Sequence, residues 1–92
     1  MNQSDKIREF VYKNFVAPVR ARGGTQVEVM AGDVHRQMGL VSAMPHVCSA
    51  LGANKFLDEY GLRRISRGGP ANGARATFVF GFTKEHLDRP RG

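Results

Sequence analysis

The C-terminal third of the chain carries the pattern that restricts the fold most. Three phenylalanines occupy alternate positions of the segment 76–82 (ATFVFGF), namely Phe78, Phe80 and Phe82. A period of two predicts a strand with the three rings on one face. Residues 62–67 (LRRISR) predict a second strand, and the intervening run 68–73 (GGPANG) can continue neither. The sequence therefore predicts a β-hairpin with a glycine-rich tip.

A first helix and a further strand are predicted in the N-terminal third. Ser4 and Asp5 are good N-cap residues for a helix over residues 4–16. Pro18 disfavours helical backbone at the residue before it, so the helix is expected to end there. Residues 19–24 (VRARGG) predict a flexible basic connection. Residues 25–30 (TQVEVM) alternate apolar and polar side chains, which predicts a short half-buried strand.

Two more helices are predicted in the middle of the chain. The first starts at Gly32-Asp33 and stops at Gly39, a natural C-terminal residue for a helix. Residues 40–42 link it to the second, where Pro45 fits the first turn. Residues 54–60 (NKFLDEY) either extend that helix or form a separate turn before Gly61. In the second helix an arc of about 100° is apolar, and it consists of Met44, Val47, Cys48 and Leu51.

The predicted order is helix, strand, helix, helix, strand, glycine-rich tip, strand. This order resembles the winged helix-turn-helix domain over residues 5–82. Residues 32–51 (GDVHRQMGLVSAMPHVCSAL) are similar to the helix-turn-helix segments of restriction-associated and mobile-element proteins. The expected fold class is therefore α+β, with three helices and a small antiparallel sheet. Ninety-two residues suit one domain with one modest core, so we expect a single domain over 1–92 with a charged tail at 83–92.

The charge of the chain favours a polyanionic partner. Fourteen Lys and Arg stand against eight Asp and Glu, a formal net charge of +6. Basic side chains that meet phosphates release condensed counterions, and the arginine fork suits phosphate and guanine better than an ammonium does. Cys48 is the one cysteine of the sequence, which fits a reducing cytoplasm. No apolar run approaches the roughly 20 residues that span a bilayer, so we expect a cytoplasmic protein without a membrane partner.

The resemblance implies that the third helix enters the major groove of duplex DNA. The side chains of this helix support groove entry. Those opposite the apolar arc are small or polar, so they would let the helix approach base edges. Ser42, His46 and Ser49 would supply hydrogen bonds there, while Ala50 and Ala53 would contact thymine methyl groups. The alternative is the ordinary solvent-exposed face of a core helix.

Basic residues on and around the hairpin are the second set of candidate DNA contacts. No acidic residue interrupts positions 62–82, and the four arginines there are Arg63, Arg64, Arg67 and Arg75. The hairpin of a winged-helix domain, called its wing, lies along the DNA backbone or enters the minor groove. The negative potential of that groove attracts arginine. The alternative is that these charges protect a sheet edge from aggregation. Arg36 in the preceding helix and Lys55 beyond the third helix are further candidates for phosphate contact.

Other chemistry finds less support in the sequence. The phenylalanine face could stack on single-stranded bases, but a chain with six Phe and no Trp needs these rings in its core, so packing is expected. The three histidines lack the spacing of metal ligands, and Cys48 and His46 would point to different faces of a helix. We therefore expect no catalytic residue, no metal and no cofactor.

These features predict sequence-preferring binding of double-stranded DNA by a small transcriptional regulator that is not an enzyme. One such module contacts few base pairs, so a homodimer on a two-fold site is expected, with the first helix or the tail as its contact. Two other functions stay open. One is a protein-interaction module that keeps the fold without binding DNA, and the other is a binder of RNA or single-stranded nucleic acid.

Overall fold

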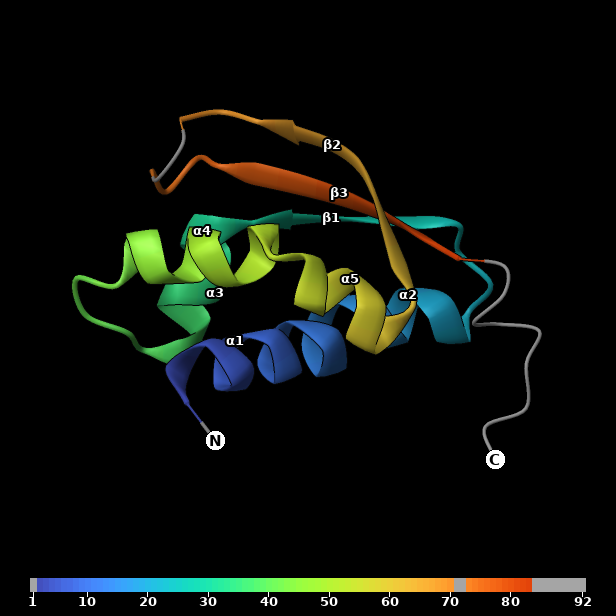
Figure 1. Cartoon of the computed structure of the whole chain (residues 1–92), viewed down its shortest axis with the longest axis horizontal. Helices are drawn as coiled ribbons and strands as arrows, with labels where there is room; N and C mark the ends of the chain where they lie inside the picture. The colour runs from blue at the N-terminus through green and yellow to red at the C-terminus, as the bar shows by residue number, and fades with distance from the viewer. Residues whose placement is uncertain (1, 71–72, 84–92) are drawn as a thin grey trace.

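The computed structural model of the chain describes residues 2–70 and 73–83, and most of the expected tail at 83–92 lies outside these residues. In Figure 1 the three strands cross the upper part of the molecule, α1 lies at the bottom, and α4 and α5 lie between them. The elements follow one another as α1 (Gln3–Val11), a π-helical segment η1 (Tyr12–Val16), α2 (Ala17–Ala21), β1 (Gln26–Met30), α3 (Ala31–Met38), α4 (Met44–Gly52), α5 (Asn54–Tyr60), β2 (Leu62–Gly68) and β3 (Thr77–Phe82).

The strands form one antiparallel sheet in the order β1-β3-β2. The N-terminal strand pairs with the second strand of the hairpin, with Val27 opposite Phe80 and Val29 opposite Phe78. These four side chains are buried, and Val27 and Val29 alternate with exposed residues along β1. The predicted α+β class, with a small three-stranded antiparallel sheet, is therefore confirmed, and so is the pairing of segment 25–30 with the hairpin.

The first helical segment is longer than the sequence predicts. Helical backbone continues past Pro18 to Ala21, so only residues 22–25 connect it to β1. A proline inside an α-helix lacks an amide hydrogen, and its ring clashes with the carbonyl four residues earlier. The π-helical segment η1 widens the preceding turn, and the Ala17 amide donates to the Tyr12 carbonyl five residues back. Pro18 then stands in the first turn of α2, where proline is tolerated.

The short helices in the middle of the chain have the predicted bounds. Gly39 and Gly61 both take left-handed backbone, with φ of 68° and 65°, and end α3 and α5. Ala53 is extended between α4 and α5, so residues 54–60 form a separate helix rather than an extension of α4. This extended residue turns the chain toward β2 and leaves the end of α4 beside that strand.

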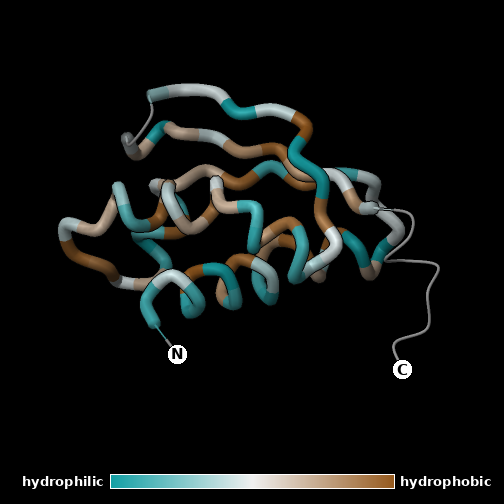
Figure 2. The backbone as a smooth tube through the Cα atoms, in the orientation of Figure 1, coloured by the Kyte–Doolittle hydropathy of each residue, from teal (hydrophilic) through white to brown (hydrophobic). Residues whose placement is uncertain are grey.

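The core lies between the helices and one face of the sheet. Figure 2 shows apolar positions concentrated in the middle of the molecule, where helices and strands meet. Phe56 of α5 meets Phe80 of β3 edge to face, with ring centroids 5.2 Å apart. Fully buried side chains come from the helices and from the sheet, and they include Ile7, Val11, Val29, Val34, Val47, Leu51, Phe56, Phe78 and Phe80.

Leu51→Ala tests whether α4 is held by this core. Leu51 is fully buried, so its truncation should lower the free energy of unfolding by about 2–5 kcal/mol through lost contacts and a residual cavity. Leu57→Ala makes the same change at a half-buried position of α5 and should cost less. Urea unfolding followed by circular dichroism measures both. A loss at Leu51 no larger than the loss at Leu57 would contradict this packing.

Candidate nucleic-acid interface

The exposed face of α4 consists of small and polar side chains. Ser42, His46 and Ser49 are exposed as predicted, and Ala53 is half-buried at the end of the same face. The opposite side of the helix carries Val47, Cys48 and Leu51 in the core, with Met44 packed against it. This face is therefore an exposed helix surface of small and polar groups.

Ala50 does not belong to the exposed face, so its predicted role as a thymine contact is wrong. The residue is 1% exposed. Helix α4 packs against α1 as well as against the core below the sheet, so it is buried on two sides. The Arg8 guanidinium of α1 reaches across this contact and donates to the Ala50 carbonyl at 3.5 Å. The periodicity of α4 predicts one apolar arc, and it does not predict the second packed side against α1.

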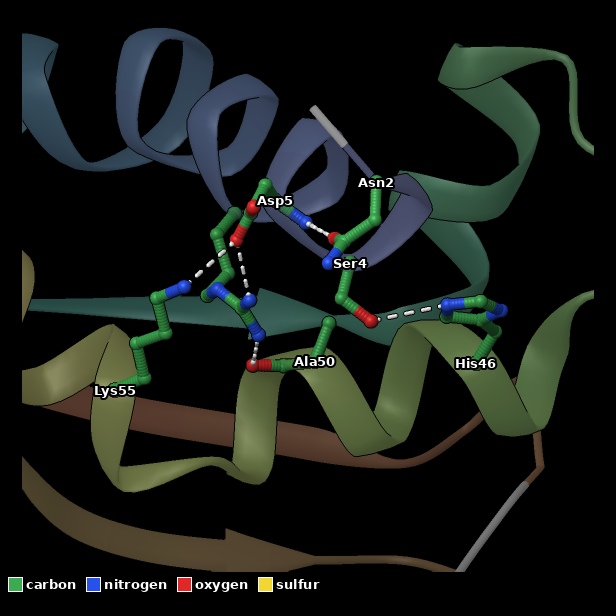
Figure 3. Close-up of polar contacts among 7 residues, drawn as sticks. Asn2, Ser4, Asp5, His46, Ala50 and Lys55 are labelled. Carbon is green, nitrogen blue, oxygen red and sulfur yellow. Dashed lines mark hydrogen bonds and ion pairs between the residues drawn. The ribbon is translucent and has the colours of Figure 1, made fainter.

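An ion-pair network centred on Asp5 holds α1 against α4 and α5. The Asp5 carboxylate accepts from the buried Arg8 at 2.7 Å and from Lys55 at 3.2 Å, while the Asp5 amide donates to the Asn2 side chain at 2.8 Å (Figure 3). The neighbouring Arg8 and Lys55 cations hold the pKa of the Asp5 carboxyl below its ordinary value of 3.8. Lys55, predicted as a phosphate contact, is thus an ion-pair partner within the fold.

His46 lies at the junction of α4 with the start of α1. Its Nε2 is 3.0 Å from the Ser4 hydroxyl, and Figure 3 shows the two side chains meeting across the gap between the helices. This contact fixes the ring at the edge of the exposed face. A shallow pocket of about 600 Å³ lies beside it, lined by Ser4, Ser42, Ala43, Pro45, His46 and Ser49.

The turn that leads into α4 depends on a histidine that the sequence analysis did not single out. The Ala43 amide donates to His35 Nε2 at 3.2 Å, and Ala43 is the N-cap residue of α4. A ring nitrogen accepts a hydrogen bond only without its own proton, so this bond requires a neutral ring with the proton on Nδ1. Ser42 beside it has a φ of 49°, a left-handed backbone uncommon outside glycine. His35 therefore supports the start of the exposed face.

A β-bulge divides the arginines of β2 between the two faces of the sheet. Arg64 lies opposite Phe80 but Ser66 lies opposite Val79, so Ile65 is an extra residue in β2. Residues three apart in a regular strand point to opposite faces. Because of the bulge, Arg64 and Arg67 both stand opposite core phenylalanines and point to the helix side.

These two arginines approach the C-terminal end of α4. Arg64 donates to the Gly52 carbonyl, and the Arg67 guanidinium lies over the Phe78 ring at 4.8 Å from its centroid. A second shallow pocket joins the two elements, lined by Cys48, Ser49, Gly52, Ala53 and Arg67. Ser49 lines both pockets, so the exposed face of α4 continues without interruption to the Arg67 guanidinium.

The remaining predicted contacts lie elsewhere. Arg63 stands opposite Gly81 on the outer face of the sheet, away from α4. Arg36 is exposed on α3 and pairs with Asp33 at 3.0 Å. Arg75 is exposed at the base of the hairpin tip, between Ala74 and Ala76, whose carbonyls accept from the first amides of α3. The structure therefore brings only part of the predicted set together on one surface. The residues on this surface are Ser42, His46, Ser49, Ala53, Arg64 and Arg67.

Other kinds of site find no support in the described part of the chain. Phe78 and Phe80 are fully buried, so the predicted packing of these rings is confirmed and they cannot stack on bases. Cys48 is buried, and this burial raises the pKa of its thiol. Residues 2–70 and 73–83 contain no cluster of three metal-binding side chains. Within the same residues no helix is long and apolar enough to cross a bilayer.

Asp5→Asn tests the ion-pair network. A carboxylate whose pKa is lower in the folded chain than in the unfolded chain stabilises the fold at pH values above the unfolded pKa, here the ordinary value of 3.8. This contribution disappears as the pH falls through the lower, folded pKa. We expect the variant to unfold more easily than the wild type at pH 7, with the difference shrinking below about pH 4.

Urea unfolding between pH 2 and pH 7 measures this difference. The matched control is Asp58→Asn, the same change at an exposed position of α5. A difference between the Asp5 variant and the wild type that stays constant with pH would show that the Asp5 carboxylate does not carry the stabilisation.

Comparison with known proteins gives no family for this chain. No protein-family model matches it, and no curated protein or solved structure matches it at a significant level.

Proposed function

We propose that the chain is a winged helix-turn-helix protein that binds double-stranded DNA with sequence preference and acts as a small transcriptional regulator. The observation that carries this proposal is the continuity of the exposed α4 face with the arginines of β2. Ser49 belongs to both pockets along this surface, and Arg67 lines the second. A surface that joins small polar groups to fixed cations suits a base-reading helix flanked by phosphate contacts.

Helix α4 has the properties of a groove-reading helix. The major groove is about 12 Å wide and admits an α-helix, provided that its leading face carries no bulk. Ser42, His46 and Ser49 offer hydroxyl and imidazole groups that can donate to or accept from base edges. His46 already holds a defined position through Ser4, so little side-chain freedom would be lost when it meets a base.

The arginines of β2 would then contact the phosphates beside the groove. Arg67 is positioned over the Phe78 ring, and Arg64 is tied to the end of α4 through the Gly52 carbonyl. Guanidiniums held in place before binding lose less conformational entropy than free ones. The net charge of +6 adds a general attraction to the DNA backbone.

Two additions distinguish this chain from the winged-helix order expected from the sequence. Helix α5 stands between α4 and β2, and the first helical segment continues through η1 and α2. His46 and Ser49 are exposed in the folded chain, so neither addition covers the proposed reading face.

The binding experiments below also test two alternative functions. A protein-interaction module would use the same surface without affinity for DNA that depends on salt. A binder of RNA or single strands would prefer those probes to duplex, although the burial of Phe78 and Phe80 removes the stacking platform that favoured this function.

Replacing Arg67 tests the electrostatic part of the proposal. Arg67→Ala should weaken binding to all duplexes alike and reduce the slope of log affinity against log salt by about one. Arg22→Ala is the matched control, since it removes the same charge from the exposed end of α2. Fluorescence anisotropy with labelled duplex and single-stranded probes at several salt concentrations measures affinity and slope, and thermal melting checks folding. Equal effects of the two variants would exclude Arg67 from the interface.

The double variant His46→Ala, Ser49→Ala tests sequence reading. A good contact to a base edge is worth roughly 1–3 kcal/mol of discrimination, so preference for the selected site over a scrambled duplex should fall by about tenfold or more. Non-specific affinity should change little, because the double variant keeps Arg64 and Arg67, the proposed phosphate contacts. The cognate site is first selected from random duplexes with the wild-type chain. A double variant that kept the full preference would place sequence reading on another surface.

A further inference from the structure

The turn between α3 and α4 exposes an aliphatic side chain almost completely. Val41 is 84% exposed, whereas the two other exposed large hydrophobic residues among residues 2–70 and 73–83, Met30 and Ile65, are 39% and 41% exposed. Figure 1 shows this turn projecting at the left end of the molecule, beside the start of α4. A single exposed valine is common on protein surfaces, so its role depends on how the turn holds it and on what lies beside it.

Two hydrogen bonds at the end of α3 fix the first half of the turn. The Gly39 amide donates to the Arg36 carbonyl, and the Leu40 amide donates to the His35 carbonyl, both at 3.1 Å. This pair of bonds is the Schellman motif, in which the residue after the glycine packs back on the helix. Leu40 is half-buried and packs against the core. Of the two adjacent aliphatic side chains in the turn, Leu40 therefore points inward and Val41 stays in solvent.

His35 also fixes the second half of the turn. Its ring accepts from the Ala43 amide at 3.2 Å, so the same residue binds the turn on both sides of Val41, once through its carbonyl and once through its ring. A β-branched side chain has restricted rotation about its Cα–Cβ bond. The backbone and the methyl groups of Val41 are thus held in position while exposed, and a ligand that meets them would cost little conformational entropy.

Val41 directly precedes the surface that we propose reads DNA. The next residue, Ser42, lines the pocket at the start of α4 together with His46 and Ser49. In helix-turn-helix proteins the first residues of the reading helix contact base edges, so the residue just before them would come close to the same groove. All four bases offer hydrogen-bonding groups in the major groove, and thymine adds an apolar group, its C5-methyl. A thymine methyl is therefore the part of this groove that an aliphatic side chain fits.

We infer that Val41 is a specificity-determining residue that packs its methyl groups against the 5-methyl group of a thymine in the major groove. The inference rests on the proposed DNA binding, and it names a base that the target must contain near the start of α4. The sequence analysis gave the thymine contacts to Ala50 and Ala53, but Ala50 is buried and Ala53 follows α4 at its opposite end. Val41 would thus supply the apolar part of base reading, beside the polar side chains of α4.

Removing single methyl groups from the DNA tests this contact. Deoxyuridine pairs as thymidine does but lacks the 5-methyl group, so each thymine of the site selected with the wild-type chain is replaced by it in turn. One of these replacements should weaken wild-type binding by about fourfold, which is the contribution of one buried methyl group. Val41→Ser should lose the response to that replacement, because it removes both methyl groups of the side chain. Val41→Ile keeps a β-branched aliphatic side chain and should keep the response. Fluorescence anisotropy measures each affinity.

Ile65→Ser is the matched control and should keep both the affinity and the response of the wild type. It makes the same change from an aliphatic side chain to serine at an exposed position, where Ile65 lies against Gly81 on the outer face of the sheet, away from α4. Thermal melting verifies that each variant folds.

Two results would overturn the inference and leave the proposed DNA binding intact. One is a response to deoxyuridine that Val41→Ser retains, since such a response would come from the shape of the DNA rather than from this side chain. The other is a wild-type chain that prefers its site but binds it equally well whichever thymine methyl is missing, or a selected site without thymine. A wild-type chain with no preference among duplexes would instead contradict the proposed function and this inference together.

Discussion

The fold depends on the burial of two phenylalanines from the central strand. Phe78 and Phe80 of β3 are fully buried, their rings stack 6.2 Å apart, and Phe80 also meets Phe56 of α5 edge to face. The strand that carries them is paired on both sides, so its position fixes β1 and β2 as well. Helices that pack on these rings are thereby placed relative to the whole sheet. The loss of either ring would affect both the helices and the sheet. These side chains pack against the helices, and they belong to the central strand.

One extra residue in β2 determines how the basic residues of the hairpin are used. Ile65 shifts the register, so Arg64 and Arg67 reach α4 while Arg63 stays on the outer sheet face. A regular strand would have sent Arg64 and Arg67 to opposite sides. The bulge thus separates two surfaces of different chemistry on one short strand. The helix side joins cations to the small polar face of α4, and the outer side carries Arg63 beside the exposed Ile65.

The position of α4 depends on groups that come from far away in the chain. Arg8 is buried, and a buried charge is tolerated only with a partner, which Asp5 supplies at 2.7 Å. The same guanidinium meets the Ala50 carbonyl, and Lys55 closes the network from α5. His35 holds the N-cap residue of α4 from the other end. Together these contacts fix the orientation of the exposed face of α4.

Local pattern was enough to predict β1, α3, α4 and the hairpin, because periodicity and glycine stops act within a few residues. It also placed Ser42, His46 and Ser49 on an exposed face, since these positions lie opposite Val47, Cys48 and Leu51 on one helix. Tertiary structure alone decided the rest. Ala50 is buried because α1 packs on a second side of α4, and Pro18 stays helical because η1 widens the turn before it. The division of the arginines follows from the register of β2 against β3, a pairing between residues that no single segment of the sequence specifies.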